Sequence, residues 1–128
     1  MKVLIVEDDE DSRVFLERAL RGHHYSVESA GNGVEALGKA YEWHPDLIIS
    51  DILMPGMNGF ELCRRVKTDE KLRNIPFIFY TATFVDQNDE KLAMALGASR
   101  FHGRNDSYHV LPIINDDGLS PKMTSYNL

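Results

Sequence analysis

Cysteine and basic residues are both scarce in this chain of 128 residues. Its single cysteine, Cys63, excludes a disulfide framework and a zinc site built on several thiolates. Lysine and arginine together number 14 against 20 aspartates and glutamates, so the formal net charge is −6. This charge argues against a basic face for a nucleic-acid backbone and against a polybasic membrane patch. We expect no direct nucleic-acid partner and no membrane partner.

Long apolar runs are missing as well. No stretch approaches the roughly 20 apolar residues that span a bilayer, and the first apolar run stops at Glu7, too early for a signal peptide. Apolar residues still make up 43% of the sequence, which is enough for the core of one ordinary domain. These properties predict a cytoplasmic protein with a single domain.

Short apolar runs alternate with helical patterns along most of the chain. Runs typical of strands stand at residues 3–6, 25–30, 47–49, 77–80 and 100–102, and helical spacing is found at 12–21, 34–43, 60–66 and 87–96. In the second helical segment, Val34, Leu37 and Tyr41 form one apolar stripe. Strands that alternate with helices predict an α/β fold, with parallel strands, right-handed crossovers and helices on both faces.

The end of the chain breaks this alternation. Residues 110–114 are apolar enough for a short helix, but Pro112 interrupts it. From Asp116 onward the sequence is polar and is typical of a tail. We expect a folded domain over residues 1–115 and a polar tail over 116–128.

Acidic side chains follow two of the predicted strands. Glu7 and Asp8 end the first strand, and Asp51 ends the third. In an open α/β sheet, ligands bind at the carboxyl ends of the strands. Three carboxylates meeting there would repel one another unless a cation lay among them, and all-oxygen ligands suit Mg²⁺ or Mn²⁺. The simpler alternative, an acid that caps the following helix, applies to Asp9 or Glu10.

Other kinds of site are not indicated. A dinucleotide or flavin fold would place a glycine-rich phosphate turn after the first strand, where this chain has acids. The spacing suggests neither a P-loop nor a Ser/His/Asp nucleophile set. A phosphatase that used Asp51 on an external substrate would need a second catalytic acid or base, and the sequence suggests none. Met54 and Met57 flank a turn and are expected to pack it rather than to bind a metal.

Three stretches resemble a known family. Val3–Asp9 (VLIVEDD), Asp51–Gly59 (DILMPGMNG) and Tyr80–Ala82 (YTA) are similar to the receiver, or phosphoacceptor, domain of two-component response regulators. The resemblance extends from about Lys2 to Phe101. It implies a flavodoxin-like doubly wound sandwich with a five-stranded parallel sheet in the order 2-1-3-4-5.

The resemblance also implies roles for individual residues. Asp51 matches the aspartate that takes a phosphoryl group from a histidine kinase. Glu7 and Asp8 match the acidic pair that holds Mg²⁺, with Asp8 the direct ligand and Glu7 acting through water. The backbone carbonyl of Leu53 matches a further ligand, alongside Asp51.

Two more positions match the switch of this family. Thr81 corresponds to the hydroxyl that turns toward the phosphoryl group, and Phe101 to the aromatic residue that moves with it. The implied protein is a signalling phosphoacceptor rather than an enzyme. Its partners would be a sensor histidine kinase or phosphotransfer protein, and a downstream protein or a missing output domain.

The sequence after Phe101 departs from the family pattern. Where receivers carry a lysine followed by proline, this chain has Arg104 and Asn105, and the arginine fork differs in size and reach from an ammonium group. Arg104 could pair with Asp51 or a phosphoryl oxygen, or it could point to solvent. The last helix is expected to be short or irregular. These departures leave open an alternative, a receiver-like interaction module that works without phosphorylation.

Overall fold

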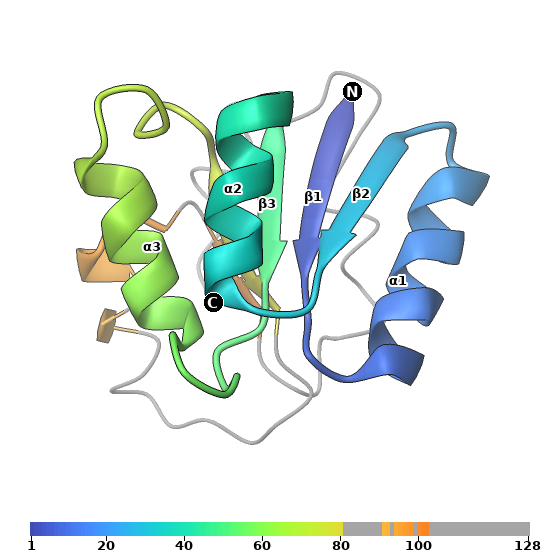
Figure 1. Ribbon diagram of the computed structural model, residues 1–128, viewed down its shortest axis with the longest axis horizontal. Helices are drawn as coiled ribbons and strands as arrows, with labels where there is room; N and C mark the ends of the chain where they lie inside the picture. The colour runs from blue at the N-terminus through green and yellow to red at the C-terminus, as the bar shows by residue number, and fades with distance from the viewer. Residues whose placement is uncertain (81–90, 93, 99, 103–128) are drawn as a thin grey trace.

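Strands and helices alternate along the chain as the sequence predicts (Figure 1). The computed structural model describes residues 1–80, 91–92, 94–98 and 100–102, the last three by their backbone alone. The elements are β1 (Lys2–Val6), α1 (Glu10–Gly22), β2 (Ser26–Ala30), α2 (Gly33–Trp43), β3 (Leu47–Ser50), α3 (Gly59–Thr68), β4 (Phe77–Tyr80) and β5 (Arg100–His102). Of the helix expected at 87–96, the described residues 91, 92, 94 and 95 are helical.

The strands form one parallel sheet in the order β2-β1-β3-β4-β5. In this order β2 pairs with one edge of β1, and the next strand in sequence, β3, pairs with the opposite edge of β1. Val6, the last residue of β1, pairs with Ala30 of β2 and with Ser50 of β3. The flavodoxin-like order implied by the resemblance is confirmed, and it puts the point of reversal between the ends of β1 and β3, where such sheets bind ligands.

Both faces of the sheet are covered, which explains the unbroken apolar strands. Alternate residues of β1 serve two separate cores: Leu4 and Val6 pack with α2 and α3, whereas Val3 and Ile5 pack with α1. Figure 1 shows α2 and α3 together on one side of the sheet and α1 on the other. The strands are therefore packed between α1 on one face of the sheet and α2 and α3 on the other.

Of the predicted apolar stripe of α2, only Leu37 packs against the core, and it is partly buried. Val34 is 71% exposed and Tyr41 is also exposed, whereas the buried face of the helix consists of Gly33, Ala36 and Ala40. Small side chains at a packing contact allow a helix axis to approach its neighbour more closely than large ones do. The residues of α2 that are fully buried are therefore small ones rather than the larger residues of the predicted stripe.

Asp9 is the residue that caps α1, which decides between the two acids considered above. Its carboxylate accepts a hydrogen bond of 2.9 Å from the Ser12 amide, and Glu10 is the first residue of the helix. The hydrogen bonds from Ser12 hold the pKa of Asp9 below its usual range. This carboxylate therefore stabilises the helix terminus.

The predicted boundary between a domain at 1–115 and a tail at 116–128 lies outside the described residues. Among the residues that the structure does describe, no helix is long and apolar enough to cross a membrane.

Candidate functional site

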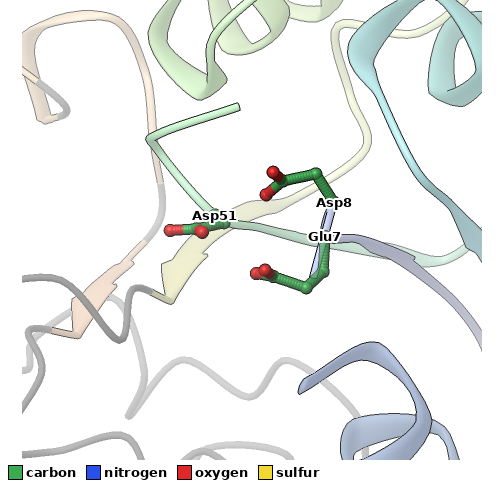
Figure 2. A group of neighbouring side chains, drawn as sticks. All are labelled: Glu7, Asp8 and Asp51. Carbon is green, nitrogen blue, oxygen red and sulfur yellow. The ribbon is translucent and has the colours of Figure 1, made fainter. Parts of the chain in front are cut away.

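Three carboxylates meet beyond the ends of β1 and β3. Glu7 and Asp8 come from the end of β1 and Asp51 from the end of β3, and Figure 2 shows all three projecting into the same space. One carboxylate oxygen from each lies within 4.8 Å of the others. The juxtaposition follows from the pairing of Val6 with Ser50, which brings the next residue of each strand to the same edge. The expected meeting of these three side chains is confirmed.

Asp51 is fixed by its own backbone surroundings. Its amide donates a 3.0 Å hydrogen bond to the Val6 carbonyl, which extends the pairing of β1 and β3 by one residue. Its side-chain Oδ1 accepts a 2.7 Å hydrogen bond from the Ile52 amide, and the residue is only 6% exposed. One oxygen of the carboxylate is thus held in place by the backbone of the next residue.

Gly59, the first residue of α3, packs directly against Asp51. Its amide donates a 2.8 Å hydrogen bond to the Ile52 carbonyl. A Cβ at position 59 would lie 2.1 Å from the Asp51 carbonyl oxygen and 2.9 Å from Ile52 Cα. Only glycine allows this approach, so Gly59 sets how closely the start of α3 approaches the end of β3. In the sequence Gly59 is only a member of a motif, with no sign of this contact.

Replacing Gly59 by alanine is expected to lower the free energy of unfolding by about 1–3 kcal/mol, because backbone atoms must shift to admit the methyl group. Urea denaturation measures the change. Gly38→Ala in α2 is the matched control: nothing lies within 4 Å of its Cβ position, so alanine there should stabilise the helix by about 0.5–1 kcal/mol. Equal effects at the two positions would contradict the tight contact at Gly59.

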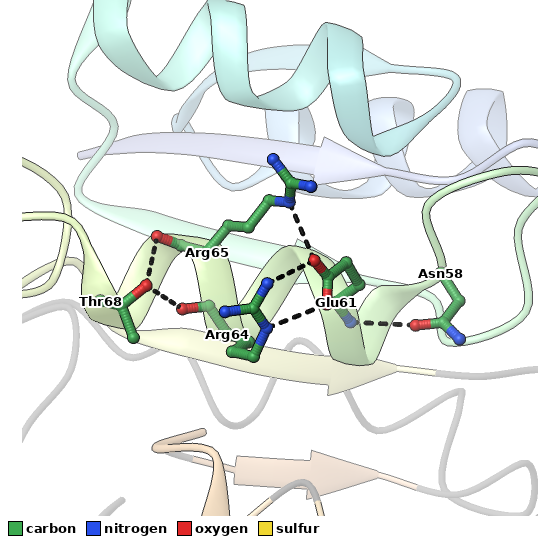
Figure 3. A network of polar contacts seen from close by, with 5 residues as sticks. All are labelled: Asn58, Glu61, Arg64, Arg65 and Thr68. Carbon is green, nitrogen blue, oxygen red and sulfur yellow. Dashed lines mark hydrogen bonds and ion pairs between the residues drawn. The ribbon is translucent and has the colours of Figure 1, made fainter.

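The polar start of α3 is also well defined. The Asn58 side chain caps the helix by accepting a 2.9 Å hydrogen bond from the Glu61 amide. Figure 3 shows Glu61 in turn bound by Arg64 and Arg65, at 2.6 and 3.0 Å. These two guanidinium groups hold the pKa of Glu61 down to about 2. The network anchors the first turn of the helix that supports Asp51.

A second close approach joins the loop after Asp51 to α2. A Cβ at Gly33 would lie 2.7 Å from the Met57 sulfur, so Met57 rests on the glycine backbone. Met54 is buried in the core between the sheet, α2 and α3. Both methionines therefore pack this loop, as the sequence predicts.

Glu7 is a buried acid whose pKa lies well above its ordinary value. It is only 5% exposed, and burial is the main cause that raises its pKa to about 8, followed by the negative charge of Asp51. A hydrogen bond between the two side chains and the charge of Asp8 act in the same direction. A 3.1 Å hydrogen bond from the Asp9 amide to the Glu7 carboxylate opposes them.

A divalent cation fits this arrangement on electrostatic grounds. Two of the three acids are buried, and burial together with the repulsion from Asp51 favours a proton on Glu7 near neutral pH. A hard cation among the oxygens would remove that repulsion and take the place of the proton. The all-oxygen donor set suits Mg²⁺ or Mn²⁺.

The other predicted site residues are Leu53, which the structure describes in full, and three residues that it describes only in part or not at all. Leu53 lies in the loop two residues after Asp51 with its side chain 55% exposed, and the role of its carbonyl stays a prediction. The backbone of Phe101 pairs with Phe79 between β5 and β4, but its side chain is outside what the structure describes. Thr81 and Arg104 also lie outside the described residues.

An open parallel sheet with three carboxylates, two of them buried, at its point of reversal defines the class: an α/β domain with an acidic site at the carboxyl ends of its strands. The family model for the response regulator receiver domain matches residues 3–102. The chain belongs to this family, and it is a receiver domain of two-component, phosphorylation-based signalling. Receiver domains of this family are signalling phosphoacceptors.

Individual relatives agree with this assignment. The response regulator PleD of Caulobacter vibrioides is 38% identical over 100 residues, which cover 78% of this chain and 22% of PleD. The polar-differentiation response regulator DivK of Brucella ovis is 38% identical over 90 residues, which cover 70% of this chain and 73% of DivK. This chain thus spans about a fifth of PleD.

Solved structures give the same fold. The signal receiver domain of a signal transduction histidine kinase from Syntrophus aciditrophicus superimposes with a TM-score of 0.81 and 35% identity. The superposition covers 99% of this chain and 97% of that one.

Proposed function

We propose that Asp51 accepts a phosphoryl group from a phosphohistidine and that Glu7 and Asp8 hold the Mg²⁺ needed for the transfer. The observation that carries the proposal is the meeting of Asp51 with the two acids within 4.8 Å at the point of reversal of the sheet. Of the acidic pair, Asp8 is the direct ligand and Glu7 acts through water; Asp51 and the backbone carbonyl of Leu53 are the further protein ligands.

Phosphoryl transfer to Asp51 requires little beyond in-line positioning of the reacting groups and neutralisation of their charge. An Asp51 carboxylate oxygen forms a bond to phosphorus while the P–N bond of the donor breaks and its electron pair returns to the imidazole. Mg²⁺ supplies neutralisation of the charge on the phosphoryl oxygens. The Ile52 amide holds one Asp51 oxygen at 2.7 Å, which leaves the other as the nucleophile. The product is an aspartyl phosphate on this chain.

Phosphorylation would then alter the surface of the domain. The new group adds negative charge and acceptor oxygens, which would draw the Thr81 hydroxyl inward and let Phe101 follow. The change is a population shift between two arrangements of the same fold. A sensor histidine kinase or phosphotransfer protein is the proposed donor, and a downstream protein or a separate output domain reads the result.

Intact-mass measurement after incubation with acetyl phosphate tests this proposal. The wild-type chain should gain one phosphoryl group in Mg²⁺ and none in EDTA. Arg104→Lys restores the family's usual residue at the position that departs from it. A gain by Arg104→Lys alone would identify Arg104 as a block to phosphorylation, and no gain by either would favour the phosphorylation-independent interaction module.

A further inference from the structure

Arg13 connects α1 to the end of β1 beside the acidic cluster. It lies at the start of the second turn of the helix, is half-buried, and its Nη1 donates a 2.9 Å hydrogen bond to the backbone carbonyl of Glu7. That carbonyl belongs to the peptide that joins Glu7 to Asp8. The arginine therefore bonds to the main chain between the two acids rather than to a carboxylate of the cluster.

Both peptides that flank Asp8 are held by hydrogen bonds. On the amino-terminal side, the Glu7 carbonyl accepts from Arg13. On the other side, the Asp9 amide donates to the Glu7 carboxylate at 3.1 Å. Asp8 itself is exposed, so packing does not orient its side chain. The direction in which its carboxylate leaves the backbone depends on these two fixed peptides.

The turn between β2 and α2 lies beside the Arg13 guanidinium. The guanidinium Nη1 lies 3.6 Å from the Cβ position of Gly31, and the Glu35 carboxylate accepts a 3.1 Å hydrogen bond from the Gly31 amide. The Gly31 hydrogen bond is the main cause that lowers the pKa of Glu35, and the charge of Arg13 contributes to it. In addition, the Glu7 amide donates to the Ala30 carbonyl at 3.0 Å.

We propose that Arg13 is a positioning residue for the cation site: by fixing the peptide between Glu7 and Asp8, it sets the direction of the Asp8 carboxylate. The inference rests on the proposed function of this cluster. It assigns to α1 a residue that shapes the site without touching the cation or the phosphoryl group. The role resembles that of the outer groups that orient metal ligands in other proteins.

The sign of the effect on Mg²⁺ affinity separates positioning from simple charge. If Arg13 acted only as a positive charge near the cluster, its removal would tighten cation binding, because like charges repel. If Arg13 orients the Asp8 carboxylate, removal of Arg13 must weaken Mg²⁺ binding, even though it also removes a positive charge that repels the cation. Arg18, which is exposed on the same helix, offers the matched control for charge.

Isothermal titration with Mg²⁺ on the full chain, with thermal unfolding in parallel, tests the inference. We expect Arg13→Ala to bind Mg²⁺ about 10-fold more weakly than wild type, in line with the loss of other outer groups. Arg13→Lys, which keeps one donor and the charge, should recover part of the affinity. Arg18→Ala should stay within about twofold of wild type, since its charge is exposed and screened.

Either of two results would overturn the inference. Arg13→Ala could bind Mg²⁺ more tightly than wild type, or it could bind Mg²⁺ as tightly as wild type, whether or not its unfolding temperature falls. If Arg13→Ala does not fold, Arg13→Lys with wild-type affinity would have the same meaning. An absence of Mg²⁺ binding in wild type as well would reject the proposed cation site itself, whereas a failure confined to the Arg13 variants would leave that site intact.

Discussion

Asp51→Asn should gain no phosphoryl group from acetyl phosphate under conditions in which the wild-type chain gains one. A carboxamide oxygen is a far weaker nucleophile than a carboxylate and carries no charge with which to hold a cation. The expected effect is therefore complete loss of the mass increase rather than a slower reaction. Intact-mass measurement over time distinguishes these outcomes.

The substitution should leave the fold in place. The carboxamide oxygen of the variant could still accept the hydrogen bond from the Ile52 amide that Asp51 Oδ1 accepts at 2.7 Å. Loss of the negative charge also removes a repulsion that raises the pKa of Glu7. Asp11→Asn, at an exposed acid in the first turn of α1, is the control and should be phosphorylated normally. A phosphorylated Asp51→Asn chain would show that another residue is the acceptor.

Glu7→Gln should make the Mg²⁺-free protein more stable at alkaline pH. The folded-state pKa of Glu7 is about 8 against an ordinary value of 4.5, so the unfolded chain loses this proton first as pH rises. The contribution of Glu7 to the free energy of unfolding is therefore greatest below about pH 4.5 and is lost as the pH rises through about 8. Glutamine, which does not titrate, avoids this loss.

The expected gain from Glu7→Gln is on the order of 2 kcal/mol near pH 9 in EDTA, and it should shrink toward about pH 5. Urea denaturation at several pH values measures it, with the exposed Glu28→Gln on β2 as control. Saturating Mg²⁺ should narrow the difference, because cation binding stabilises the folded wild-type chain. A variant that is less stable than wild type near this alkaline pH in EDTA would contradict the assigned cause.

Much of the fold follows from local sequence. The run from Val3 to Val6 is apolar at every position, as a strand buried on both faces must be, and the same holds for the run at 77–80. Acids at the ends of the first and third runs therefore had to meet once the strands were parallel neighbours. An acid before the first helical pattern, Asp9 or Glu10, marked a helix start for the same local reason.

Other features depended on how the elements approach one another. Nothing in the sequence favoured burial of Ala36 and Ala40 over the larger side chains of α2, since that choice depends on the distance between helix and sheet. The role of Gly59 depends on where α3 begins relative to the Asp51 carbonyl. Neither distance is encoded in a periodic pattern.

Residue patterns alone were enough to predict the order of strands and helices, the family, and which acids end the strands. The burial of Glu7 beside Asp51, with its pKa raised to about 8, and the hydrogen bond from Arg13 to the Glu7 carbonyl became visible only in the folded chain. The reason is physical: periodicity and turn chemistry act between neighbours in the chain, whereas desolvation and charge repulsion act between groups that meet only after folding.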